Sequence, residues 1–308
     1  MAAASASSTR LKLWGVRGSI PVPGPATVRY GGNTTCVEVR ADGELIVLDA
    51  GSGIRELGLA LEKEFGSRPI NLSLLITHVH WDHIQGFPFF VPFYNDKNQI
   101  RIFGYDGADF GMREILKSQM ATPFFPVALY DLPGKIKIEK LDDAKEFNIG
   151  KVRICWRFVN HPGTCVGYRL FTSKGSIAFL PDNEPYEAFK LHAAESHLLS
   201  PEQMRKRADE ERADLVKFLQ GSDILILDTQ YTDEEYEAHV GWGHGSLSTA
   251  ISLARDASVR KLILFHHDPT HDDEAIGKMV QAARRIAAKS ESNLEIEGAR
   301  EGIEMTID

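Results

Sequence analysis

The sequence predicts a layered α/β fold, and three observations favour it. Short apolar runs have the length of strands and are almost continuously apolar, as in strands buried on both faces. Helix-like segments separate several of these runs. Each run ends in an aspartate or a histidine. Polar residues just past the carboxyl ends of buried strands line the ligand crevice of α/β proteins, so we expect one crevice to collect these groups.

The predicted strands follow one another along the chain with a polar residue at each end. In order they are LIVLDAG from Leu45, LSLLITH from Leu72, SIAFLPD from Ser176, DILILDTQ from Asp223 and KLILFHHD from Lys261. The polar endings expected at the crevice are Asp49, the His78–His83 cluster, Asp182, Asp228 and His266.

Three segments between the strands read as helices. Gly53–Phe65 carries apolar residues at helical spacing, Pro201–Leu219 is strongly charged, and Leu247–Ala257 opens behind a serine. The charged helix lies in an insertion from Asn183 to Gly221. An ordinary surface helix is the favoured interpretation of that insertion, and a lid or a dimer contact is the alternative.

Length and composition fit one domain with a large core. The chain has 308 residues, of which 43% are hydrophobic, and no stretch has the composition of a linker. We therefore expect a single domain over residues 11–308. Residues 1–10 are small and polar without an apolar region, so a disordered tail is expected there rather than a signal peptide.

Charge and cysteine usage narrow the partners and the compartment. A formal net charge of −8 argues against binding nucleic acid by electrostatics alone, so no stable nucleic-acid complex is expected. A small anionic substrate remains compatible, because a metal can supply positive charge locally. Three cysteines are too few for a disulfide scaffold, and no apolar stretch has membrane-spanning length. We expect a cytoplasmic protein without membrane contact.

The segment ITHVHWDHIQG, residues 76–86, is the strongest chemical signal. His78 and His80 are two apart in an extended stretch, so both side chains leave on the same face. Asp82 and His83 follow where the strand turns into a helix. Imidazole and carboxylate suit Zn²⁺, and also Mn²⁺ or Fe²⁺. The alternative is a set of surface histidines without a metal. It does not explain why the histidines and the aspartate are spaced H-x-H-x-D-H directly after a buried strand.

This segment resembles the H-x-H-x-D-H motif of the metallo-β-lactamase superfamily. Further segments resemble the ligand motifs of its phosphodiesterase branch, which includes tRNase Z and cyclic-phosphate diesterases. They are VNHPGTCVGYRL with His161, AFLPDNEP with Asp182 and LILFHHDP with His266. His267 follows directly, and since neighbouring strand residues point to opposite sides, only one of the two is expected to face the metals; the family position favours His266.

The resemblance implies an αββα sandwich of two mixed sheets flanked by helices, with two divalent metal ions, Zn²⁺ first and Mn²⁺ or Fe²⁺ as alternatives. One ion would be held by His78, His80 and His161, and the other by Asp82, His83 and His266. Asp182 would bridge them. Asp82 is also counted among the catalytic residues. Asp49 stands where the family carries a carboxylate that orients a ligand histidine, and a turn-forming aspartate is an equal alternative.

A proton donor is suggested by DTQYTDEEYEAHVGWGHGSLSTA. It resembles a two-part signature of the phosphodiesterase branch, an acid at a strand end and a histidine opening the next helix, here Asp228 and His244. A histidine held by a carboxylate can protonate the departing alkoxide of a diester. The family more often has Glu at the first position and Ser-Thr directly after the histidine. The alternative is that His244 only neighbours a helix cap.

Two residues near the start are weaker candidates for substrate contacts. Asn33, in YGGNTT, could meet a phosphate, although a two-glycine turn is more often a hairpin. Arg17 stands in WGVRGS, which resembles the first glycine loop of the branch, and could meet a substrate anion.

The resulting prediction is a dinuclear metal-dependent hydrolase that cleaves small phosphodiesters, such as a cyclic nucleotide or cyclic ribose phosphate, by metal-bound hydroxide. The stretch between His161 and Asp182 is too short for the tRNA-binding arm of tRNase Z. A lactone, thioester or β-lactam hydrolase of the same fold is the alternative. Flavodiiron proteins carry a carboxylate where His80 stands, and a non-catalytic module would not need the complete ligand set. A homodimer is an oligomeric state expected only by analogy to relatives.

Overall fold

The computed structural model describes residues 8–106, 111–186, 200–289 and 293–308. The chain divides into two compact units, which are described in turn. The first unit comprises Met1–Trp156, Leu170–Gly175 and Arg300–Asp308, and the second comprises Arg157–Arg169 and Ser176–Ala299. The single domain expected from the sequence remains a prediction.

The first unit is built around a seven-stranded mixed sheet with the order β14-β1-β2-β3-β4-β5-β6. Its strands, in chain order, are β1 Thr9–Gly15, β2 Cys36–Ala41, β3 Glu44–Leu48, β4 Asn71–Leu75, β5 Gln99–Gly104, β6 Lys135–Lys140 and β14 Glu304–Ile307. The pairs from β14 to β3 are antiparallel, and those from β3 to β6 are parallel. Because β1 begins at Thr9, the last two residues of the predicted tail belong to a strand, which corrects that boundary.

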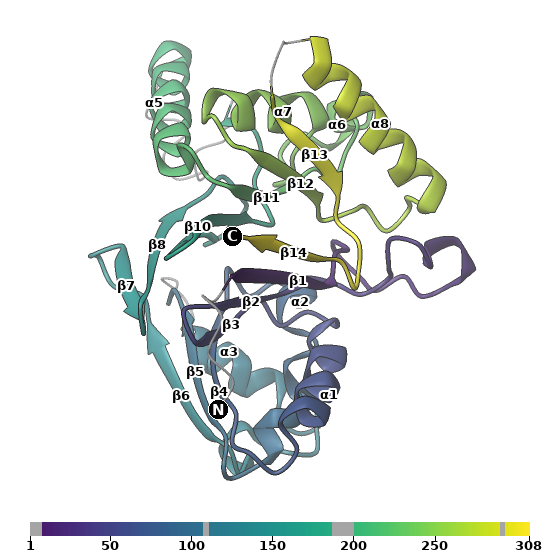
Figure 1. The fold of residues 1–308 in the computed structure, drawn as a ribbon. Helices are drawn as coiled ribbons and strands as arrows, with labels where there is room; N and C mark the ends of the chain where they lie inside the picture. Colours follow the sequence, from purple (N-terminus) through teal and green to yellow (C-terminus); the bar gives the residue numbers. More distant parts are fainter. Residues whose placement is uncertain (1–7, 107–110, 187–199, 290–292) are drawn as a thin grey trace. The chain divides into compact units, whose positions relative to one another are not determined.

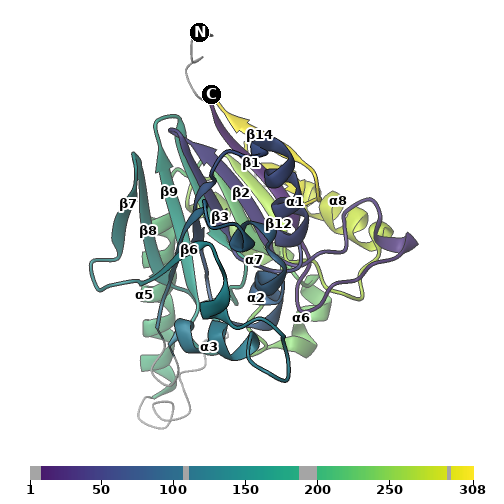
Figure 2. The same ribbon diagram turned by 90° about the horizontal axis from the view of Figure 1, so that it is seen from below.

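Helices cover one face of the first sheet. They are α1 Ile54–Phe65, the short α2 Trp81–Ile84 and α3 Met112–Gln119, and Figure 2 shows all three in front of the same sheet. The apolar side chains of α1 are buried at helical spacing, at Ile54, Leu57 and Leu61. They join a core that also takes its residues from β3, β4 and β5.

The second sheet has the order β13-β12-β11-β10-β9-β8-β7. Its strands are β7 Glu146–Ile149, β8 Val152–Phe158, β9 Val166–Thr172, β10 Gly175–Leu180, β11 Ile224–Asp228, β12 Lys261–Phe265 and β13 Glu295–Gly298. The pairs from β10 to β13 are parallel, whereas β7 and β8 form an antiparallel pair. The five strands expected from the sequence are thus confirmed as β3, β4, β10, β11 and β12.

Among the described residues, the helices of the second unit are α5 Pro201–Leu219, α6 Asp233–His239, α7 Leu247–Asp256 and α8 Asp273–Lys289. Figure 1 shows α7 and α8 on the same side of the parallel strands. The charged helix begins where predicted, because the Ser200 hydroxyl accepts from the N–H of Gln203 and Pro201 opens the first turn. The predicted lid falls partly on residues 187–199, which lie outside the described residues. Among the helices of the described ranges, none combines the length and apolarity needed to cross a membrane.

Candidate functional site

The first unit gathers three imidazoles just past the end of β4. The backbone of His80 is extended, and α2 begins at the next residue. The ring of His78 lies 4.5 Å from that of His80 and 4.2 Å from that of His83, measured between centroids. The expected clustering of these side chains is therefore present within this unit.

Asp49 orients one of these imidazoles from the end of β3. It is completely buried, and its Oδ2 lies 2.8 Å from Nδ1 of His83. Its Oδ1 accepts from the backbone N–H of Thr77 at 2.7 Å. Burial raises the pKa of the Asp49 carboxyl above its ordinary value, although His83 and Thr77 favour the charged form. A carboxylate on Nδ1 makes Nε2 the basic nitrogen of the His83 ring.

Asp82 completes a donor set that fits a divalent cation. Its Oδ2 lies 3.2 Å from Nε2 of His83 and accepts from the backbone N–H of Ser19 at 2.8 Å. A basic nitrogen and a carboxylate oxygen held this close are the two donor types of zinc sites. The first unit thus contributes three imidazoles and one carboxylate of the kind that holds a metal.

Replacing Asp49 by asparagine is expected to weaken metal binding about 10–100-fold, because loss of an orienting partner typically has this effect. The measurement is a competition titration against a chromophoric chelator. Glu64→Gln is the matched control, since Glu64 pairs with Arg40 on the surface of the same unit. Equal metal affinities for Asp49→Asn and the control would remove the orienting role of Asp49.

Asn33 and Arg17 are held by hydrogen bonds to other residues of the first unit. Glu301 accepts from both the backbone N–H and the side-chain amide of Asn33, at 2.6 and 3.1 Å. Arg17 is completely buried, and its Nε donates to the carbonyl of Gly31 at 2.8 Å. A contact of either residue with a substrate phosphate stays a prediction.

The second unit places two imidazoles against the two oxygens of one carboxylate. Asp182 follows β10 and is buried. Its Oδ2 lies 3.6 Å from Nε2 of His161, and its Oδ1 lies 3.2 Å from Nε2 of His266. A carboxylate that offers one oxygen to each of two imidazoles is suited to bridge two cations, each with its own histidine.

The hydrogen bond at Nδ1 fixes the tautomer of His161 and of His266. Nδ1 of His161 lies 2.8 Å from the carbonyl of Gly243, and Nδ1 of His266 lies 2.9 Å from Oε1 of Gln230. Both oxygens only accept, so both Nδ1 atoms donate and both Nε2 atoms keep a lone pair. His267 instead directs its Nε2 to the carbonyl of Ala299 at 2.9 Å. His266 is therefore the member of the pair that faces Asp182.

Two residues of the clusters adopt a left-handed backbone. Asp49 has φ of 61° and His266 has φ of 62°, and each directly follows a strand. A non-glycine residue in this region costs about 1–3 kcal/mol, and such residues concentrate at functional sites. Because of these turns, the side chains do not continue the alternation of the strands before them.

Gly243 approaches His161 so closely that no side chain fits. Its φ is 93°, and a Cβ atom added there would lie 2.4 Å from Nδ1 of His161. Gly243→Ala is expected to displace the imidazole and lower metal content, as measured by elemental analysis after dialysis. Gly221→Ala is the control, since Gly221 also has positive φ but meets nothing within 4 Å. Equal metal content in both variants would show that the close approach does not matter.

The buried Asp228 pairs with the partly buried His244 next to these candidate ligands. Oδ2 of Asp228 lies 2.8 Å from Nδ1 of His244. The His244 ring stacks on the His266 ring at 4.9 Å between centroids. Because Asp228 engages Nδ1, Nε2 is the ring nitrogen that would transfer a proton if His244 acts as an acid. The pair has the geometry of a carboxylate that orients a general acid.

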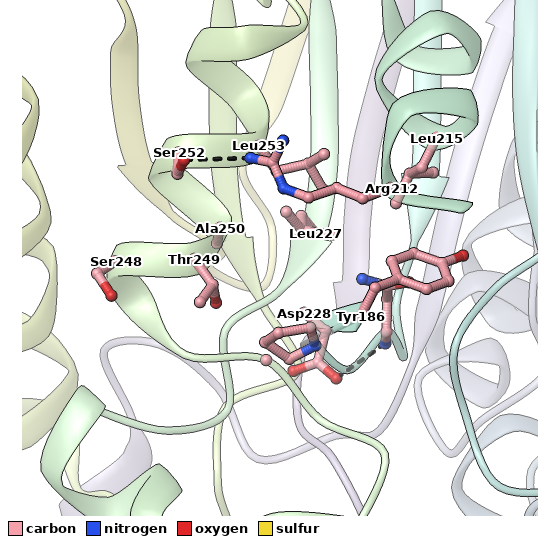
Figure 3. Close-up of a pocket in the computed structure, with 13 residues that line it drawn as sticks. Tyr186, Arg212, Leu215, Leu227, Asp228, Ser248, Thr249, Ala250, Ser252 and Leu253 are labelled. Atoms are coloured by element: carbon pink, nitrogen blue, oxygen red, sulfur yellow. Dashed lines mark hydrogen bonds between the residues drawn. The ribbon is translucent and has the colours of Figure 1, made fainter. Parts of the chain in front are cut away.

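A cavity of about 300 Å³ borders Asp228 within the second unit. Figure 3 shows Arg212 reaching from α5 to Ser252 on α7, 3.2 Å away, with Asp228 at the opposite end of the cavity. Asp228 is held there by backbone donors, because its oxygens accept from the N–H groups of Asn183 and Gln230 at 3.2 and 2.9 Å. Hydrogen bonds therefore fix the position of this carboxylate.

Sequence reasoning did not identify the residues that orient the candidate ligands. Thr77 directly precedes His78, and Gln230 lies two residues after Asp228, so their positions after strand ends were a usable signal. Ser19 acts through its backbone, and the buried Glu184 gave no signal beyond its place two residues after Asp182.

Comparison with known proteins places these clusters in a family context. The family model described as "Beta-lactamase superfamily domain" matches residues 45–267. Ribonuclease Z from Thermoplasma acidophilum is 26% identical, covering 91% of this chain and 92% of that protein.

Two solved structures are similar over almost the whole chain. Unliganded yeast PDE1 has a TM-score of 0.66 at 16% identity and covers 98% of this chain and 99% of its own. The metallo-β-lactamase fold protein YhfI from Bacillus subtilis has a TM-score of 0.64 at 15% identity, with 97% and 100% covered. At these identities the likeness shows the fold, and the predicted fold class is confirmed.

Proposed function

The chain belongs to the β-lactamase superfamily domain family, and on that premise we propose that it is a metal-dependent hydrolase that cleaves small phosphodiesters at a dinuclear site. The observation that carries the proposal is the Asp182 carboxylate with one histidine Nε2 facing each of its oxygens. The relative named Ribonuclease Z supports phosphodiester chemistry, because cleavage of RNA is hydrolysis of a phosphodiester.

The proposed metal ligands are the residues that the family resemblance implies. His78, His80 and His161 would hold one ion, Asp82, His83 and His266 the other, and Asp182 would bridge them. Two divalent cations in such a site activate water and stabilise the charge of an in-line displacement. The imidazole and carboxylate donors suit Zn²⁺ first, with Mn²⁺ and Fe²⁺ as alternatives that elemental analysis distinguishes.

His244 is proposed as the group that protonates the leaving alkoxide. Asp228 holds its Nδ1 at 2.8 Å, which directs Nε2 to the departing oxygen and stabilises the protonated ring before transfer. Arg17 and Asn33 are retained as proposed contacts of the substrate phosphate.

A small diester is favoured over an RNA substrate by the connection between β9 and β10. Strand β9 ends at Thr172 and β10 begins at Gly175, so a two-residue turn joins them. No RNA-binding arm is accommodated in that turn. The net charge of −8 also disfavours a polyanion held by surface electrostatics.

The test is hydrolysis of bis(p-nitrophenyl) phosphate by the metal-loaded protein. We expect turnover that a chelator removes and an added divalent cation restores, with little activity on p-nitrophenyl acetate or a lactone. No diester turnover by a fully metallated protein, together with turnover of a carbon ester, would replace the proposal by the carbon-ester alternative. Competition between a 2′,3′-cyclic nucleotide and a 3′-extended tRNA tests substrate size, and preferential cleavage of the tRNA would contradict the small-substrate proposal.

A further inference from the structure

Glu184 is a buried carboxylate at the junction of three segments of the second unit. Its side chain is 4% exposed. Its Oε1 accepts from the hydroxyl of Tyr236 on α6 at 3.0 Å and from the backbone N–H of Gly241. Its Oε2 accepts from the backbone N–H of Gly243 at 3.1 Å. The carboxylate therefore fastens the glycine loop of residues 241–243 to the chain just past Asp182.

The backbone of Glu184 fastens a second segment at the same point. Its N–H donates to the carbonyl of Asn160 at 2.7 Å, and its carbonyl accepts from the side-chain amide of Asn160 at 3.1 Å. Asn160 directly precedes His161. One residue thus connects the segment before His161, the segment after Asp182 and the loop before His244.

Burying a carboxylate costs free energy of folding unless hydrogen-bond donors surround its oxygens. Removing an ionised group from water carries a large penalty, which strong hydrogen bonds offset. The donors that face Glu184 here are two backbone amides and a phenol, all of them neutral. The arrangement is suited to holding a loop in one position, since two of its backbone N–H groups donate to the same carboxylate.

The loop that Glu184 holds serves two groups of the proposed site. The carbonyl of Gly243 accepts from Nδ1 of His161 at 2.8 Å, and the next residue is His244. Gly241 and Gly243 have φ of 89° and 93°, so the loop follows a path that side chains rarely allow.

We propose that Glu184 is the positioning residue that sets both the tautomer of the ligand His161 and the place of the proton donor His244. The inference rests on the proposed function. It adds that one carboxylate, that of Glu184, positions both a proposed metal ligand and the proposed proton donor. Glu184 contacts neither metal nor substrate in this assignment and acts only through the loop it anchors.

The first readout is independent of metal and activity. Long-range ¹H–¹⁵N spectra of histidine-labelled, metal-free protein report the tautomer of each imidazole. We expect Glu184→Ala to shift the His161 signal away from the Nδ1–H tautomer and to move the His244 signal. Glu184→Gln keeps one accepting oxygen and should give a smaller change in the same signals. Glu211→Gln is the control, a half-exposed carboxylate that pairs with Arg157 in the same unit.

The second readout is kinetic. Misplacing a catalytic group by about 1 Å costs about 100-fold in rate, so Glu184→Ala is expected to lower kcat by about that factor with little change in KM. The loss should be greater for a diester with a poor leaving group than for bis(p-nitrophenyl) phosphate, because only the former depends strongly on the proton donor.

The outcomes separate this inference from the proposed function. Unchanged His161 and His244 signals in a folded Glu184→Ala protein overturn the positioning role, whatever the activity. Shifted signals in a protein whose wild type hydrolyses no diester support the positioning role and reject the proposed function. If Glu184→Ala does not fold, Tyr236→Phe removes one donor and keeps the carboxylate. It should then produce a small shift of the same two signals, and an absence of shift would overturn the inference.

Discussion

Asp182→Ala is expected to reduce diester hydrolysis to background and metal content to less than half of the wild-type value. The reason is that its carboxylate lies between the Nε2 atoms of His161 and His266. Its oxygens lie 3.6 Å from Nε2 of His161 and 3.2 Å from Nε2 of His266, so its removal takes a donor from each proposed ion. Turnover of bis(p-nitrophenyl) phosphate and elemental analysis of the same sample measure the two effects.

Two further variants separate a bridging carboxylate from a structural one. Asp182→Asn keeps the shape but removes the charge, and it should also lose metal, because a neutral amide oxygen is a weaker ligand. Asp223→Asn is the matched control, since its carboxylate accepts from the N–H of Ser176 at the opposite end of the same pair of strands. Full metal content in Asp182→Asn would show that the carboxylate does not ligate.

The parts of this structure that could be predicted from sequence are local in the chain. The apolar runs that became β3, β4, β10, β11 and β12 are each five or six residues long and can be recognised without knowledge of their partners. The histidine cluster lies within six positions, so its spacing alone indicates a common target. The cytoplasmic location and the homodimer have no such local signature and stay predictions.

The orienting groups could not be predicted because they are distant in sequence from what they orient. Gly243 accepts from His161 across 82 positions, and Gln230 accepts from His266 across 36. Nothing in the local sequence around either histidine specifies which oxygen will meet its Nδ1. The residue types are also ordinary, a backbone carbonyl and an amide, so no composition signal marks them.

The division between His266 and His267 shows where a local rule reaches its limit. Strand alternation predicts that only one of them faces the metals, and the structure has His266 facing Asp182. However, β12 ends at Phe265, and His266 has a positive φ. The turn, rather than the alternation of the strand, determines its direction, and a turn at a non-glycine residue is not predictable from the apolar pattern.

His244→Ala is expected to lower kcat for diester hydrolysis about 10²–10⁴-fold, which is the usual contribution of a positioned general acid. Metal content should remain at the wild-type value. Nδ1 of His244 lies 2.8 Å from Asp228 but 3.9 Å from Asp182, so the ring is committed to the carboxylate of Asp228 rather than to a ligand position. Kinetics and elemental analysis on one preparation test both statements.

His239→Ala serves as the matched histidine control. His239 lies on α6 of the same unit, where its Nδ1 contacts the carbonyl of Glu235, and it stacks on Tyr231. We expect its replacement to leave kcat within a factor of about two, as a residue outside the proposed chemistry should. Loss of metal in His244→Ala would instead identify His244 as a ligand, since Asp182, His244 and His266 lie close enough together to hold a cation.

The dependence on leaving group distinguishes proton donation from other roles of His244. A p-nitrophenolate departs with little need for a proton, whereas an alkoxide requires one, so the rate loss in His244→Ala should grow as the leaving group becomes more basic. Asp228→Asn should show the same trend with a smaller amplitude, because it disturbs the orientation of the ring and keeps the imidazole. A loss of equal size for all leaving groups would mean that His244 binds the substrate or stabilises charge. No loss on any diester, with carbon-ester hydrolysis intact, would favour the lactone and thioester alternative, whose chemistry does not need this donor.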